Sequence, residues 1–172
     1  IGLSRNNSVF GMSGVDYGIG FGNYGGSETD GYTINFNEQY DLSNNIINRM
    51  SSVFDTNNNK LVITYNNSGN NRGYIRVGNV DNNSMLYGDQ IEICSTELLN
   101  SELCVDYNSN KLVIFYTTSN THYVKVGSLS GNSITIGTEV ILNVSNVSKM
   151  YPIYDPVNNN IIVFYNSSNN KY

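Results

Sequence analysis

The sequence predicts an all-β protein assembled from one repeated unit of short antiparallel strands. The chain contains no Trp and no Ala, is rich in Asn and Ser, and takes most of its apolar residues from Ile, Val and Tyr, which favours strands and turns over helices. The segment FDTNNNKLVITY at 54–65 returns as VDYNSNKLVIFY at 105–116 and as YDPVNNNIIVFY at 154–165. The segments between these copies keep a constant order, with a period of about 50 residues.

The first two segments of the unit are predicted to be strands joined by a turn. MSSVFD, ELCVDY and KMYPIYD alternate apolar and polar residues around the repeated aspartate. KLVITY, KLVIFY and NIIVFY follow the turn and are apolar or aromatic almost throughout, as expected of a strand covered on both faces. We therefore expect the second segment to be an inner strand of its sheet.

The turn between these strands has the pattern of a hairpin stabilised by side-chain hydrogen bonds. An Asp side chain can accept backbone N–H groups two residues on, and Asn tolerates the left-handed conformation of a tight turn. The structural turn positions are predicted at Asp55, Asn59, Asp106, Asn110, Asp155 and Asn159. Calcium binding is the alternative, because D-x-N-x-N places oxygen atoms at alternate positions. Lys60 and Lys111 stand where a calcium loop needs Gly, and no bidentate Glu follows, so no metal ligand is predicted.

The third and fourth segments are predicted to be half-buried strands. GYIRVGN at 73–79 and HYVKVGS at 122–128 alternate apolar and polar residues before a Gly, and YGIGFGN at 17–23 is an earlier copy. The fourth segment is NNSMLYGDQIEI at 82–93 and GNSITIGTEVIL at 131–142, and both match GYTINFNEQY at 31–40.

Four short strands per unit, joined by Asn- and Gly-rich turns, are typical of a propeller blade. The predicted fold class is an all-β, β-propeller-like array of four-stranded antiparallel blades, with a tandem array of small β-domains as the alternative. The expected divisions are a partial first repeat at 1–48, a second repeat at 49–98, a third at 99–148 and a truncated fourth at 149–172.

Both ends of the sequence are expected to fall within a unit, because residues 1–8 resemble residues 61–68 and Tyr172 aligns with Tyr123. About three and a half repeats are fewer than the four to eight blades of a closed propeller. The sequence is therefore expected to be part of a larger propeller. Ring closure between separate chains and an open stack are the alternatives.

The charge and the motifs argue against several functions. With a net charge of −5 and 13% charged residues, the chain has no basic patch for a nucleic-acid partner. No apolar run approaches the roughly 20 residues needed for membrane insertion as a helix. No catalytic motif or phosphate-binding loop is present, and the sole histidine, His122, is replaced by Gly73 in the other copy, so it is expected to be solvated. No enzyme activity, cofactor or catalytic residue is predicted.

Three side-chain groups leave alternatives open. Cys94 and Cys104 are expected to be free buried thiols, with a disulfide between them as the alternative. Several acidic residues are scattered without a spacing that pairs them, so a glycosidase remains a remote alternative. These acids are Glu28, Asp30, Glu38, Asp41, Asp89, Glu92, Glu97 and Glu102. Candidate stacking platforms for sugars, at strand ends or in loops, are Tyr24, Tyr32, Tyr87 and Tyr151.

The repeated unit resembles the propeller-like repeats of large structural proteins of bacteriophages and large DNA viruses, and of some surface proteins. The resemblance is carried by the Asp-to-Tyr segment in its three copies, by Val77-Gly78 and Val126-Gly127, and by NSITIG at 132–137. It implies a non-catalytic structural or attachment module of a virion or extracellular assembly: a fibre, an appendage or a surface decoration. The expected partners are further repeats of the same chain or other copies, with a cell-surface glycan or receptor as candidate ligand. A lectin binding one sugar per blade is the alternative.

Overall fold

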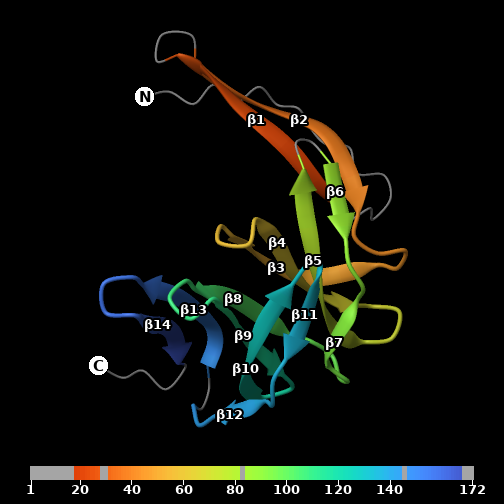
Figure 1. The fold of residues 1–172 in the computed structure, drawn as a ribbon. Coiled ribbons are helices and arrows are strands. Elements are labelled where there is room, and N and C mark those ends of the chain that lie inside the picture. Colours follow the sequence, from red (N-terminus) through yellow and green to blue (C-terminus); the bar gives the residue numbers. More distant parts are fainter. Residues whose placement is uncertain (1–17, 28–30, 82–83, 145–146, 168–172) are drawn as a thin grey trace.

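The computed structural model of the chain is all-β and describes residues 18–27, 31–81, 84–144 and 147–167 (Figure 1). For residues 18–27 and 31–40 the description covers the backbone. The strands are β1 (Gly18–Ser27), β2 (Gly31–Asp41), β3 (Ile47–Asp55), β4 (Lys60–Asn67), β5 (Arg72–Asp81), β6 (Ser84–Tyr87), β7 (Ile91–Cys94), β8 (Asn100–Asp106), β9 (Lys111–Thr118), β10 (Thr121–Ser130), β11 (Ser133–Ile136), β12 (Val140–Leu142), β13 (Val147–Asp155) and β14 (Asn160–Ser167). Within the described ranges, no helix is long and apolar enough to cross a membrane.

The strands form two larger sheets, with one hairpin before them and one after them in the chain. Sheet I has the order β3-β4-β5-β6, and β7 also pairs with β5; sheet II has the order β8-β9-β10-β11, and β12 also pairs with β10. The N-terminal hairpin is β1–β2 and the C-terminal hairpin is β13–β14, and all strand pairs are antiparallel. β4 and β9 have partners on both sides, which confirms the inner position for two copies of the second segment; among the described strands the third copy, β14, pairs only with β13. The described strands form no closed ring of sheets.

In sheets I and II the fourth segment is two short strands, which corrects the single strand expected from the sequence; the earlier copy, β2, is one strand. β6 pairs with residues 78–81 of β5 and β7 with residues 73–75, so the two pieces lie end to end along one edge of β5. β11 and β12 divide the edge of β10 in the same way. The break falls at Gly88 and Gly137, whose N–H groups donate to the carbonyl oxygens of Val77 and Val126, each at 2.9 Å. A glycine in the segment interrupts the pairing, as in a β-bulge.

The two hairpins correspond to different halves of a sheet. In the N-terminal hairpin Gly22 lies opposite Phe36, as Gly78 lies opposite Tyr87 in sheet I, so β1–β2 is equivalent to the third and fourth segments. In the C-terminal hairpin the turn joins Asp155 to Asn160, which is the pairing of Asp55 with Lys60 in sheet I. The C-terminal hairpin is therefore equivalent to the first and second segments.

Each sheet has two faces, which we distinguish because they meet different neighbours. The forward face of sheet I carries Val53, Val62 and Val77, which lie opposite one another on β3, β4 and β5. The rear face carries the alternate residues, such as Ile63 and Tyr65. The same names apply to the equivalent residues of sheet II and of the C-terminal hairpin.

The core lies between neighbouring sheets and always joins a forward face to a rear face. In the first gap, Val62, Ile75 and Val77 of sheet I pack against a set of rear-face residues of sheet II. That set is Leu103, Val105, Leu112, Ile114 and Tyr116. In the second gap, Val113 and Phe115 of sheet II pack against the rear face of the C-terminal hairpin, including Met150. Burial of these side chains is the main force that holds the sheets together.

Candidate functional site

The three repeated aspartates lie in three turns of the same geometry. Asp55 Oδ1 accepts the backbone N–H groups of Asn57 at 3.0 Å and Asn58 at 3.2 Å, and its Oδ2 accepts the side-chain amide of Asn58 at 2.7 Å. Asp106 accepts the N–H groups of Asn108 and Ser109 and the Ser109 hydroxyl. These bonds satisfy donors that the turn would otherwise leave to water.

The third turn repeats the pattern, even though a proline follows its aspartate. Asp155 Oδ1 accepts the N–H groups of Val157 at 2.9 Å and Asn158 at 3.3 Å, and Oδ2 accepts the Asn158 amide at 2.7 Å. The asparagine that closes each turn has a positive φ, of 52° at Asn59, 53° at Asn110 and 54° at Asn159. Both carboxylate oxygens of each aspartate thus receive N–H or O–H donors, so the turns are built to stabilise a hairpin rather than to gather oxygens around a cation.

In the two more exposed turns, these hydrogen bonds lower the pKa of the aspartate carboxyl group. The pKa of Asp106 is lowered, first by the hydrogen bond from the Ser109 hydroxyl and then by the backbone N–H groups. The pKa of Asp155 is lowered by the Asn158 amide and by backbone N–H groups of the same turn. Both groups therefore remain ionised to a lower pH than a free aspartate.

Polar contacts join sheets I and II at several points. The hydroxyls of Thr64 and Ser101 lie 2.8 Å apart in the buried gap. Lys60 Nζ donates to Asn132 Oδ1 at 2.9 Å. At Gly88, an added Cβ would lie only 1.8 Å from the backbone oxygen of Asn132, so the two backbones approach each other closely there.

A cationic residue of the third strand repeats the same contact in two successive units. Arg76 Nη1 donates to the carbonyl oxygen of Leu42, and Lys125 Nζ donates to the carbonyl oxygen of Ile93 at 2.7 Å. Arg76 and Lys125 are equivalent in the repeat, as are Leu42 and Ile93. In each case a long side chain on a rear face reaches the end of the fourth segment of the preceding unit, at Ile93 in β7 and at Leu42 directly after β2. This contact was not predicted from the sequence, although the equivalent cations are visible in GYIRVGN and HYVKVGS.

A polar pocket surrounds each of these cations. The pocket beside Lys125 has a volume of about 440 Å³ and is also lined by Glu92, Cys94, Tyr123 and Glu139. Within it the Tyr116 hydroxyl donates to Glu139, and the Tyr116 and Tyr123 rings stack with centroids 5.1 Å apart.

The equivalent pocket beside Arg76 has a volume of about 300 Å³ and is lined by Asp41, Ser43, Asn44, Asn45 and Gln90. The Tyr65 hydroxyl donates to Gln90 Oε1 at 2.7 Å, as Tyr116 does to Glu139. Burial raises the pKa of Tyr65 to about 12, and burial together with Glu139 raises the pKa of Tyr116 further. Both phenols therefore serve as neutral hydrogen-bond donors. The larger pocket offers tyrosine, lysine and carboxylate groups to a ligand, and the smaller one offers arginine, amide, hydroxyl and carboxylate groups.

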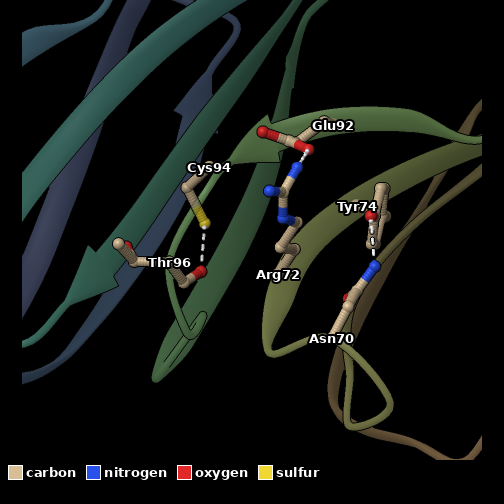
Figure 2. A network of polar contacts seen from close by, with 6 residues as sticks. All are labelled: Asn70, Arg72, Tyr74, Glu92, Cys94 and Thr96. Carbon is tan, nitrogen blue, oxygen red and sulfur yellow. Dashed lines mark hydrogen bonds and ion pairs between the residues drawn. The ribbon is translucent and has the colours of Figure 1, made fainter.

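Three polar contacts lie in the part of sheet I that includes the β4–β5 turn, β5 and β7 (Figure 2). Arg72 Nη1 lies 2.7 Å from Glu92 Oε2, and the amide of Asn70 donates to the Tyr74 hydroxyl at 2.8 Å. Cys94 donates to the carbonyl oxygen of Thr96 at 3.3 Å. Glu92 is thus an ion-pair partner of Arg72 across neighbouring strands.

The cysteines and the histidine occupy structural positions. Cys94 and Cys104 are both free thiols, so the disulfide alternative is wrong. Burial raises the pKa of both thiols, which keeps them protonated and weakly nucleophilic. His122 is buried, which corrects the expectation that it is solvated, because β10 lies between β9 and β12 at this point. Its Nδ1 lies 2.9 Å from the Thr117 hydroxyl, and burial lowers its pKa.

The four candidate tyrosines do not gather in one place in the described structure. The side chains of Tyr24 and Tyr32 lie outside the described residues. Tyr87 is half-buried on the rear face of sheet I, with the Arg76 guanidinium 5.3 Å from its ring centroid. Tyr151 is exposed on the C-terminal hairpin.

The described acids and cysteines also form no group suited to a metal ion. Among the described residues, no three His, Cys, Asp or Glu side chains come together as metal ligands. Arg49 binds Glu97 at 3.1 Å in an exposed ion pair, and Ser51 donates to Glu102 across the gap between the sheets. No protein-family model, no curated protein and no solved structure matches this chain.

Proposed function

We propose that this chain is a non-catalytic structural or attachment module of a virion or extracellular assembly, built as a β-propeller-like array of four-stranded blades. In this proposal sheets I and II are complete blades, each with a fourth strand in two pieces. The N-terminal and C-terminal hairpins are parts of further blades. The module belongs to a fibre, an appendage or a surface decoration, as the resemblance of its repeat suggests.

One observation carries the structural role. Successive gaps between sheets use equivalent residues, with a forward face packed on a rear face in both. The cation of the third strand also repeats its contact with the preceding unit. A chain that uses its repeated residues to hold neighbouring units in one relation is suited to build an extended, rigid surface.

The location can be tested with antibodies raised against the 172-residue chain. Immunogold electron microscopy of particles and cell envelopes from the source should label their outer surface. A source strain without the gene provides the control for unspecific label. Label restricted to the cell interior would contradict the proposed role.

A lectin is the second candidate, because the polar pockets beside Arg76 and Lys125 recur at equivalent positions. A sugar would meet the half-buried Tyr123 ring and the Glu139 carboxylate in the larger pocket, and the Gln90 amide in the smaller one. Titration with a panel of mono- and disaccharides, followed by NMR, should then perturb the resonances of both pockets. Saccharides that perturb neither pocket would remove this candidate.

A further inference from the structure

The two polar pockets occupy equivalent places in successive units, so their linings can be compared position by position. Four of the residues 41–45 line the smaller pocket, and their equivalents among residues 92–96 line the larger one. The larger pocket is also lined by the rings of Tyr116 and Tyr123, whereas the described residues that line the smaller pocket include no aromatic ring. This difference decides which ligands each pocket can hold.

The length of one turn accounts for the difference. The turn between β9 and β10 consists of residues 119–120, whereas the equivalent turn between β4 and β5 consists of residues 68–71. In the longer turn, the amide of Asn70 donates to the Tyr74 hydroxyl at 2.8 Å (Figure 2). The backbone of this turn also donates to the carbonyl oxygen of Ile46 at 2.9 Å, directly after the segment that lines the smaller pocket. The longer turn thus holds Tyr74 and this segment together.

The shorter turn leaves the tyrosine of sheet II open to its pocket. Tyr74 is 8% exposed and belongs to the buried cluster that includes Leu42 and Ile47. Its equivalent Tyr123 is half-buried and lines the larger pocket. Of the two pockets, the larger one is therefore the one that presents an aromatic ring to a ligand.

The Tyr123 ring belongs to a small apolar surface. The ring stacks on that of Tyr116, with centroids 5.1 Å apart and an angle of 19° between the planes, which fixes its orientation. Ile141 of β12 lies opposite Tyr123 in the sheet and is 56% exposed. Opposite residues of paired strands share one face, so the alkyl side chain extends the surface of the ring. Such a surface fits the C–H groups on one face of a sugar ring.

The polar walls of the larger pocket retain free hydrogen-bond acceptors. Glu139 Oε2 accepts the Tyr116 hydroxyl and lies 3.5 Å from Lys125 Nζ. Glu92 Oε2 lies 2.7 Å from Arg72 Nη1. Within the described ranges, no hydrogen bond or ion pair involves the Oε1 atom of either glutamate. Each carboxylate is thus held in place by a cation and can still accept hydroxyl groups from a ligand.

The charges of this pocket oppose an acidic ligand. Glu92, Glu139 and Lys125 are the charged residues of its lining. Lys125 already contacts Glu139 and donates to the carbonyl oxygen of Ile93 at 2.7 Å. A carboxylate in the pocket would meet two like charges and a cation that is already paired, in a chain with a net charge of −5.

We propose that the larger pocket binds a neutral pyranose sugar, stacked on the Tyr123 ring with its hydroxyl groups donating to Glu92 and Glu139, and that it rejects uronic acids. The smaller pocket, whose tyrosine is covered by the longer turn, binds the same sugar more weakly. The proposal rests on the second candidate for the proposed function, a lectin. It replaces one equal site per blade by one principal site, whose volume of about 440 Å³ lies in the usual range of ligand pockets.

The first test is an NMR titration of the isotope-labelled chain with matched pairs of methyl glycosides. Each pair is a neutral glucoside, galactoside or mannoside and the corresponding uronide, which differs only by a carboxylate in place of the primary alcohol. At least one neutral glycoside should shift the backbone resonances of residues 93–96 and 123–125. Its uronide should bind about tenfold more weakly, and residues 42–45 and 74–76 of the smaller pocket should respond at about tenfold higher concentration.

The outcomes separate this inference from the lectin itself. A neutral glycoside and its uronide that bind equally well would leave a lectin and overturn the proposed selectivity. Equal responses of the two pockets would overturn the proposed principal site. If no glycoside shifts either pocket, the lectin and this inference both fall, whereas the structural role is decided separately by the immunogold label.

Two variants of the pocket test the roles of its residues. Tyr123→Leu keeps an apolar side chain but removes the ring, and should weaken binding about fivefold. Glu139→Gln introduces the residue of the smaller pocket, where Gln90 accepts the equivalent tyrosine hydroxyl, so the fold should persist while the difference between neutral glycoside and uronide narrows. Glu97→Gln is the matched control, because it removes the same charge at an exposed position outside the lining, in an ion pair with Arg49. Equal effects of Glu139→Gln and Glu97→Gln would show a response to net charge alone and overturn the role of Glu139.

A turn exchange tests why the two pockets differ. Replacement of residues 119–120 by SGNN, the sequence of residues 68–71, should place an asparagine over Tyr123 and weaken sugar binding about tenfold. Circular dichroism checks that the exchanged chain is folded. A folded chain with the longer turn and unchanged affinity would overturn the proposal that turn length opens the larger pocket.

Discussion

Replacement of Asp55 by Ala should destabilise the protein, because it removes the hydrogen bonds that Asp55 accepts within its own turn. Asp55 is buried and accepts three hydrogen bonds, from the N–H groups of Asn57 and Asn58 and from the Asn58 amide. A hydrogen bond to a charged group contributes about 1.5–3 kcal/mol, but the exposed Asn57 N–H can bond to water after the substitution. We therefore expect a loss of about 2 kcal/mol in the free energy of unfolding.

Urea denaturation followed by circular dichroism, at one protein concentration, measures this loss. With a slope of about 2 kcal/mol per molar urea, the midpoint should fall by about 1 M. Asp55→Asn is the matched control, because an amide oxygen can still accept both backbone N–H groups. Its loss of unfolding free energy should be well below that of Asp55→Ala. Asp106→Ala and Asp155→Ala, in the more exposed copies of the turn, should also have smaller effects. If Asp55→Asn is as destabilising as Asp55→Ala, the charge and not the turn geometry matters, and the reasoning is refuted.

Three further outcomes are expected. Thr64→Val should cost about 1–3 kcal/mol because it leaves the buried Ser101 hydroxyl without its partner, and adding Ser101→Ala should restore part of the loss in a double-mutant cycle. Gly88→Ala should lower the melting temperature, because its Cβ would meet the backbone of Asn132, while Gly69→Ala, whose nearest contact is a side chain at 3.1 Å, should be close to neutral. The lowered pKa values of Asp106 and Asp155 stabilise the folded state above the ordinary aspartate value of 3.8, and this contribution should be lost as pH falls below it; Asp106→Asn should make the acid limb of the stability profile less steep.

The strands and their turns could be predicted because their determinants are local. The second segment is apolar on both faces, and this alone indicates an inner strand. The turn bonds of Asp55 are made within three residues, so the pattern of Asp and Asn contains the information. The split of the fourth segment has a visible signal too, in Gly88 and Gly137, but a single Gly does not show whether a strand bends or breaks.

The surroundings of each sheet could not be predicted, because equivalent residues have different neighbours in space. Val77 and Val126 stand in the same sequence context before a Gly, yet one is covered by the next sheet and the other is exposed. His122 was expected to be solvated because its equivalent is Gly73, and the burial of that position only follows from the pairing of β10 on both sides. The contacts of Arg76 and Lys125 depend in the same way on which strand precedes them.

The contacts between sheets I and II have a consequence for the conditions in which the protein can work. They join neutral groups, such as the hydroxyls of Thr64 and Ser101, or a charged group to a neutral one, as from Lys60 to Asn132 and from Ser51 to Glu102. Dissolved ions screen the attraction between opposite charges, but they have little effect on apolar contacts and neutral hydrogen bonds. The relation between the sheets should therefore hold from fresh water to brine, where a surface held by ion pairs would loosen.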